Sequence, residues 1–276
     1  MSAASLPYVV LIMLVELATG SLVVVTLFDA RRMVTAGYVK TGALTVLPLA
    51  AMALATALSV ARADEVDGYA LASDWFPPLR ESLVVFTAAC AAYLVATMIE
   101  QRRASIGLGV ASSVLGAVVL VTIAGLVAPP TWSYLGAIAS LLAGALVLGG
   151  ALMAMTWGHW YLTNSGLPKE PLEQMSLLVL GAVAAQTVLV VLAAIAPVRE
   201  VPLSDGLGVS LGANPAFWLR VAVGLAFPMF LAWLAWKAAA IRGMMSATGL
   251  LYIALGAVLA GELLGRGLMF ATGALV

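Results

Sequence analysis

A carboxylate and a guanidinium lie four residues apart in an otherwise apolar stretch near the C-terminal end of this chain. Glu262 and Arg266 are about one helical turn apart, so a helix would place both on one face, within reach of each other. Charges inside a bilayer cost at least about 2.5 kcal/mol each, so they usually pair, face the interior of a bundle and serve function. The pair therefore indicates either an ion-pair staple or one wall of a polar site.

Three more polar residues lie at membrane depth in other apolar segments. Glu16 is near the middle of the first segment, Gln186 is near the middle of the sixth, and Arg220 stands at the outer boundary of the seventh. With neighbouring segments antiparallel, Glu16, Arg220, Glu262 and Arg266 can converge in the outer half of the membrane. Two interpretations stay open. One is an ion-pair staple between Glu262 and Arg266 with an interfacial Arg220. The other is a polar pocket or proton relay of Glu16, Glu262 and Arg266, in which a carboxyl could exchange protons.

The single histidine, His159, lies in a second polar cluster, TWGHWYLT, residues 156–163. Its Trp and Tyr neighbours are typical of the aromatic belt at a membrane interface. The alternatives are a proton-exchanging or quinone-contacting histidine, or a metal ligand. One histidine and one cysteine, Cys90, exclude a bis-His haem, a cysteine zinc site and an iron–sulfur cluster in this chain. A His/Met haem is formally possible with 12 Met residues, but Met in apolar helices is usually packing material.

The composition is that of an integral membrane protein. Of 276 residues, 63% are hydrophobic and 9% are charged, whereas soluble domains carry about 25% charged residues. The mean hydropathy is +1.10, and apolar runs reach about 20 residues, the length of a membrane-spanning helix. A net charge of zero gives no indication of nucleic-acid binding. Residues 1–6 contain no Lys or Arg, so we expect the first segment to be a retained helix rather than a cleaved signal.

We predict an all-α fold, a single transmembrane domain over residues 1–276 that forms a polytopic bundle of eight helices. Each segment can cross a hydrocarbon core of about 30 Å at about 1.5 Å per residue. The helices are expected at about residues 7–28, 41–61, 81–99, 105–128, 133–157, 175–196, 217–240 and 247–272. Gly261 and Gly265 would let another backbone approach the last helix closely. Pro48 and Pro228 would kink the second and seventh helices.

The distribution of Lys and Arg orients the bundle. The connections after odd-numbered helices hold eight basic residues, and those on the opposite side hold three, Arg62, Arg80 and Arg199. By the positive-inside rule both termini then lie outside, in the periplasm or its equivalent, and we expect an inner (cytoplasmic) membrane location. The eight inner residues are Arg31, Arg32, Lys40, Arg102, Arg103, Lys169, Lys237 and Arg242. The first three also suit contact with anionic membrane lipid.

Residues 259–270, LAGELLGRGLMF, resemble the final-helix signature of the dimethyl sulfoxide reductase membrane-anchor family (DmsC-like), which reads roughly AGELxGRxxFY. That family is related to the wider polysulfide-reductase (NrfD-like) group. Its length, eight helices and outside N-terminus agree with the expectations above, and Phe270 stands where the family often has Tyr. The resemblance implies that Glu262 and Arg266 are the motif's polar pair and that Gly261 and Gly265 are its packing glycines.

The resemblance also implies a function. Such anchors bind a quinol, menaquinol or ubiquinol, near the outer side of the membrane and pass electrons to an iron–sulfur subunit, and they hold no haem or cluster themselves. We therefore expect a membrane anchor of an anaerobic respiratory oxidoreductase, with iron–sulfur and molybdopterin-type catalytic partner subunits. Quinone contacts are expected from Glu262, Arg266, Arg220 and His159. The alternative is a proton-conducting protein or small-solute transporter, which paired intramembrane charges and kinked helices also fit, although no clear internal repeat supports it.

Overall fold

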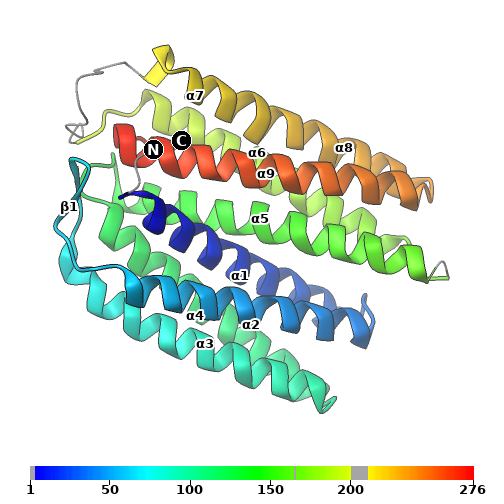
Figure 1. The fold of residues 1–276 in the computed structure, drawn as a ribbon. Coiled ribbons are helices and arrows are strands. Elements are labelled where there is room, and N and C mark those ends of the chain that lie inside the picture. The colour runs from blue at the N-terminus through cyan, green and yellow to red at the C-terminus, as the bar shows by residue number, and fades with distance from the viewer. Residues whose placement is uncertain (1–3, 165, 200–210) are drawn as a thin grey trace.

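The computed structural model describes residues 4–164, 166–199 and 211–276, which form a bundle of long helices (Figure 1). Eight helical spans in these residues are long and apolar enough to cross a membrane, which confirms the predicted all-α, multi-pass membrane fold. The helices are α1 (Leu6–Ala30), α2 (Ala36–Ser59), α3 (Phe76–Met98), α4 (Arg102–Val127), α5 (Tyr134–Thr163), α6 (Glu170–Ile195), α7 (Pro215–Leu219), α8 (Phe227–Ala240) and α9 (Met244–Thr272). Both chain ends lie at one end of the bundle, called the terminal end below, and the opposite end is called the far end (Figure 1).

Most helices extend beyond the apolar segments that predict them. α2 begins about a turn early because the Thr35 hydroxyl caps it, accepting the Tyr38 N–H at 3.4 Å. α3 begins at Phe76 rather than near residue 81 because Pro77 and Pro78 are compatible with the first turn, where an N–H has no intrahelical partner. Apolar composition marks the part of a helix inside the bilayer, and the helix itself continues to its capping residues.

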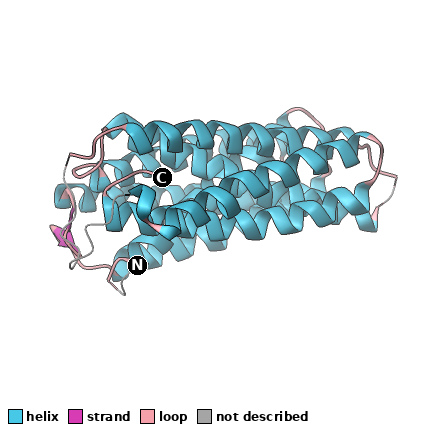
Figure 2. Ribbon diagram, turned by 90° about the horizontal axis from the view of Figure 1, so that it is seen from above, coloured by secondary structure: helices cyan, strands magenta, loops and turns pink. Residues whose placement is uncertain are grey.

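The connection between α2 and α3 contains regular structure. Strands β1 (Glu65–Val66) and β2 (Tyr69–Ala70) pair antiparallel, and a 3₁₀ turn, η1 (Ser73–Trp75), leads into α3. The buried Tyr69 ring lies 4.9 Å from the Phe270 ring of α9, centroid to centroid. Burial raises the pKa of the Tyr69 hydroxyl, which donates to a main-chain carbonyl at the end of α4. The hairpin thus covers the terminal end of the bundle, where Figure 2 shows its strands.

The bundle consists of two groups of four consecutive spans. Helices α1 to α4 pack around one another, α5, α6, α8 and α9 form the second group, and α1 lies against α5 between them (Figure 1). A Cβ atom on Gly20 of α1 would overlap the carbonyl of Ala145 of α5, and one on Gly149 would overlap the α1 backbone in turn. The two groups therefore meet backbone to backbone, the close approach that small residues allow between membrane helices.

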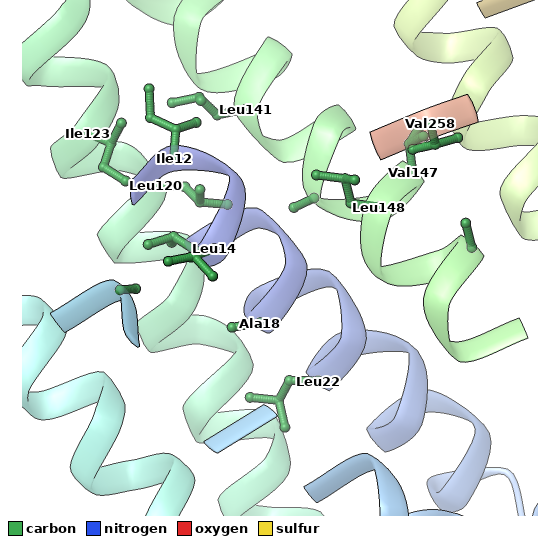
Figure 3. Close-up of a cluster of buried hydrophobic side chains, with 14 of the residues drawn as sticks. Ile12, Leu14, Ala18, Leu22, Leu120, Ile123, Leu141, Val147, Leu148 and Val258 are labelled. Carbon is green, nitrogen blue, oxygen red and sulfur yellow. The ribbon is translucent and has the colours of Figure 1, made fainter. Parts of the chain in front are cut away.

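Helix α1 is the most buried span. Figure 3 shows its side chains in an apolar cluster with α4 and α5. The labelled members from these three helices are Ile12, Leu14, Ala18, Leu22, Leu120, Ile123, Leu141, Val147 and Leu148. The outer helices instead expose large apolar side chains, such as Ile195 at 75% exposure and Val188 at 59%. Because such exposed faces belong in lipid, the surface agrees with contact between the spans and membrane lipid.

Candidate functional site

Four charged side chains meet inside the bundle, and we call them the charged network. Glu16 comes from α1, Arg220 begins the π-helical segment η3 (Arg220–Ala226) between α7 and α8, and Glu262 and Arg266 come from α9. At most 2% of any of the four is exposed. At about 1.5 Å per residue, each lies about 8–15 Å from the terminal end of its span. The charges are therefore inside the protein at the depth of a hydrocarbon core.

Glu262 is at the centre of the network. Its Oε1 accepts hydrogen bonds from Arg220 Nη2 at 2.8 Å and from the Gln186 amide Nε2 at 2.6 Å. Its Oε2 lies 3.3 Å from Arg266 Nη2. Two cations and a neutral donor from α6 thus converge on one carboxylate, and the bonds from the cations are charge-assisted.

Arg266 joins Glu262 to Glu16 across the contact between the two helix groups. Its Nη2 forms an ion pair with Glu16 Oε1 and donates to the Ser140 carbonyl oxygen at 3.3 Å. Its Nη1 donates to the Ser140 hydroxyl at 3.1 Å. The charges alternate in the order Glu16, Arg266, Glu262, Arg220 and sum to zero. Alternation offsets part of the cost of removing four charges from water, which unpaired ions could not recover.

A widened helical turn positions Arg220. Pro228 has no N–H, so the Gly224 carbonyl four residues earlier loses its α-helical donor. The helix widens into a π-helix over η3, and Arg220 Nη1 donates to the Gly224 carbonyl at 3.4 Å. A π-helical segment thus ends two residues before Pro228, at the place where a kink was predicted.

Glycines make the space that the charges occupy. A Cβ on Gly144 of α5 would lie 2.6 Å from both Arg266 Nη2 and Glu16 Oε1. Gly261 and Gly224 meet backbone to backbone, so neither position has room for a side chain. This close approach agrees with the packing role predicted for Gly261.

The chain after α9 folds back over the network. Gly273 ends the helix with φ of 75°, a left-handed conformation that glycine adopts without strain. Ala274, Leu275 and Val276 are buried, and the Val276 carbonyl oxygen packs against Gly265. Together with the Tyr69 hairpin, this segment covers the network from the terminal end.

Arg220 is the predicted site residue whose environment differs most from expectation. It is 1% exposed and bound to Glu262, not at the membrane boundary. Trp218, at 59% exposure, occupies the outward position. Because two residues rotate a helical side chain by about 200°, an outward Trp218 places Arg220 on the inward face.

His159 does not join the other predicted site residues. It lies near the far end of α5, where its Nδ1 is 3.1 Å from the Tyr252 hydroxyl. Ser140, which contacts the network, and His159 are 19 residues apart on α5, or about 28 Å along the helix. A head group bound at the charged network therefore cannot also contact His159. Within the described residues, no group of three or more His, Cys, Asp or Glu side chains could hold a metal ion.

The sequence did not identify the contributions of α5. Ser140 and Gly144 touch Arg266 and Glu16, but they are ordinary small residues in a span that contains many. A polar residue predicted at depth, Gln186, does bind Glu262. Contacts between helices depend on their rotation about their own axes, and the spacing within one helix does not report that rotation.

In comparisons with protein-family models, with curated proteins and with solved structures, this chain has no match. The resemblance of residues 259–270 to a membrane-anchor signature therefore stays a prediction, and function has to be argued from the site.

Proposed function

We propose that this chain is the integral membrane anchor subunit of a respiratory oxidoreductase, which binds a quinol or quinone and exchanges electrons with an iron–sulfur partner subunit. The observation that carries this proposal is the charged network, a buried, neutral array of two carboxylates and two guanidiniums at membrane depth. Intramembrane ionisable groups are costly, so groups of this kind are candidates for a functional site by default. The LAGELLGRGLMF resemblance adds support, because it places Glu262 and Arg266 in a signature of such anchors.

Several polar atoms of the network have hydrogen-bonding capacity that a quinone head group could use. Glu16 Oε2, Arg220 Nε and Arg266 Nε are buried and have no hydrogen-bond partner among the described residues. An arginine N–H can donate to a quinone carbonyl oxygen, and a carboxylate oxygen can accept from a quinol hydroxyl. The network therefore offers donors for the carbonyl oxygens of a quinone and an acceptor for the hydroxyl groups of a quinol. The head group would reach them past the cover formed by Tyr69 and residues 274–276.

The chemistry divides between the substrate and the protein. Oxidation of a quinol releases two electrons and two protons, and the electrons would leave to the cluster of the partner subunit. The chain itself would orient the head group through Arg220 or Arg266 and accept one of the two protons on Glu16 or Glu262, while the other leaves to water at the terminal end. Neutral pairing lets the network take up that charge change, because each carboxylate already faces a fixed cation.

The same proposal sets the orientation. Basic residues concentrate in the connections at the far end, so that end would face the cytoplasm and both termini the outside of the inner membrane. The charged network would then lie in the outer half of the bilayer. Iron–sulfur and molybdopterin-type subunits would complete the complex.

The test is Glu262→Gln in the assembled complex, with quinone binding and quinol-coupled turnover measured together. We expect turnover to fall by about 100-fold or more, the usual contribution of a positioned proton acceptor. The matched control is Glu170→Gln, whose side chain is exposed at the far end, in the first turn of α6. Unchanged turnover and unchanged quinone binding in Glu262→Gln would remove this residue from the site. A chain that purifies without an iron–sulfur partner and carries a solute flux would favour the transporter instead.

A further inference from the structure

A line of buried hydroxyl groups runs through the first helix group, from the charged network toward the far end. Thr19 and Thr26 of α1, Ser112 of α4 and Tyr93 of α3 are at most 5% exposed. None of their hydroxyls meets the geometry of a hydrogen bond in the described part of the chain, and neither does Glu16 Oε2. The Tyr93 hydroxyl does interact with the side chains of Thr26 and Thr97, so these three groups are neighbours. Buried hydroxyls in proteins nearly always have a partner, so their shared lack of one needs an explanation.

The hydroxyls of other helical residues behave differently. Thr97, Thr187 and Ser113 each donate to the carbonyl oxygen four residues earlier, at 2.7–2.8 Å. That local bond is the usual way in which a membrane helix satisfies a serine or threonine. Thr19, Thr26 and Ser112 lack it, so their hydroxyls are left to bind something between the helices.

The spacing of these groups makes one continuous row. On α1, residues 16, 19 and 26 recur at intervals of three and seven and therefore share a face. On the antiparallel α4, a Cβ on Gly109 would lie 2.5 Å from Thr26 Oγ1, and one on Gly116 would lie 2.5 Å from Thr19 Oγ1. Ser112 stands between these glycines and so fills the interval between the two threonines.

Along the helix axis the groups of the row follow one another at intervals of about 5 Å. Thr19 is about 4.5 Å along the helix from Glu16, and Thr26 is about 10 Å from Thr19, with Ser112 near the middle. Two oxygens about 5 Å apart can be joined by one water that hydrogen-bonds to both. Each interval ends in a polar group on either side, which is what a bridging water requires, although the Phe86 ring also borders Thr19 at Gly116.

The row continues to a cavity that opens at the far end. A Cβ on Gly109 would lie close to Thr26 Oγ1 and also 3.1 Å from Tyr93 Cε2. The Tyr93 ring and the Thr26 side chain therefore lie against the same glycine. Thr97, one turn beyond Tyr93, hydrogen-bonds to Ser105 at 2.9 Å. Both line a cavity of about 250 Å³.

Charged side chains mark the mouth of this cavity. Asp29 and Arg102 line it and form an ion pair at 3.2 Å. Glu100 also lines it and pairs with Lys40 at 2.7 Å, with 71% of its own side chain exposed. The cavity therefore reaches from charged side chains at the far end to Thr97, one helical turn from Tyr93.

We propose that Thr19, Ser112, Thr26 and Tyr93, joined by internal water, form a proton path between the far-end cavity and Glu16. Each hydroxyl oxygen takes a proton from one neighbour and gives its own to the next. The net result is that one proton is taken up from the water of the cavity and one proton is added to Glu16 Oε2. The transfer involves no oxidation or reduction. The path goes beyond the proposed quinone function, because it assigns the side of the membrane from which Glu16 is protonated and needs no quinone.

The test is the rate at which Glu16 gains a proton after a pH jump, in the full chain in lipid nanodiscs without quinone. Infrared difference spectra report the carboxyl band, and its loss in Glu16→Gln assigns it. We expect Thr26→Val and Ser112→Ala to slow this rate about tenfold each, the factor for one lost hydrogen bond of about 1.4 kcal/mol. Ser113→Ala is the matched control, because its hydroxyl already bonds to the Gly109 carbonyl.

Thr26→Ser keeps the hydroxyl and is expected to restore most of the rate, which separates proton transfer from damage to packing. Wild-type rates in Thr26→Val and Ser112→Ala, or equal slowing in Ser113→Ala, would overturn the proposal. Quinone binding is measured separately on the same variants. A normal proton path in a protein that binds no quinone would refute only the proposed function, and quinone binding with an unaltered protonation rate would refute only the path.

Discussion

Arg266→Met is the substitution that most directly tests whether ion pairs hold the charged network together. Arg266 contacts both carboxylates, so its loss leaves Glu16 without an ion pair and the network with one negative charge in excess. Removing one partner of a buried pair costs about 3–5 kcal/mol. The lost donors to Ser140 add about 1 kcal/mol. We expect the free energy of unfolding to fall by about 4–6 kcal/mol, a large part of the 5–15 kcal/mol typical of folded domains.

A second substitution in the same chain should recover part of that loss. Glu16→Met removes the unpaired carboxylate and leaves Glu262 and Arg220 as a neutral pair at 2.8 Å. Replacing a complete buried ion pair by apolar residues of similar volume is often neutral. The double variant should therefore be at least about 2 kcal/mol more stable than Arg266→Met alone, a coupling within the range measured for residues in contact.

The assay is unfolding in mixed micelles with increasing SDS, followed by the fluorescence of the seven Trp residues. Lys237→Met is the control, because it removes a cation near the far end that stacks on Trp236 rather than pairing within the network. A loss in Arg266→Met below about 1 kcal/mol, the value of an exposed ion pair, would contradict the reasoning. Strictly additive losses in the double variant would contradict it as well.

Three further predictions concern the helix contacts, the far end and the single cysteine. Gly20→Val should prevent the close approach of α1 and α5 and yield little monodisperse protein by size-exclusion chromatography, whereas Gly181→Ala, which meets no atom within 4 Å, should behave as wild type. The hydrogen bond and charge of Lys40 lower the pKa of Glu100, so the stabilisation from this pair is present above the ordinary pKa of the carboxyl and is lost as the pH falls through the lowered value. Lys40→Met should raise the Glu100 pKa toward its ordinary value in a carbon-13 NMR titration, and an unchanged titration would disprove the contact. Cys90, 1% exposed, should resist a maleimide in the folded protein and react after unfolding, which mass spectrometry can follow.

The sequence predicts the spans well because apolar length is a property of each segment alone. It also predicts that Glu16, Glu262 and Arg266 share a depth, because depth follows from residue count and an even number of crossings. It does not predict which charges pair. Spacing within α9 suggests a Glu262–Arg266 pair, yet Glu262 lies nearer to Arg220, at 2.8 Å against 3.3 Å. Those contacts depend on helix rotation, which is fixed by glycine contacts such as Gly224 against Gly261.

The location of Glu16 gives the network a way to link the two helix groups. Glu16 belongs to the first group, with the row of hydroxyls, whereas Arg220, Glu262 and Arg266 belong to the second. A proton that reaches Glu16 cancels the charge paired with Arg266 and leaves the network with one excess positive charge. Arg266 is then balanced only by Glu262, which already faces Arg220. Proton arrival in one helix group thus changes the electrostatic balance at a carboxylate of the other, so Glu16→Gln, which mimics the protonated state, should alter quinone affinity without itself removing a contact of Glu262.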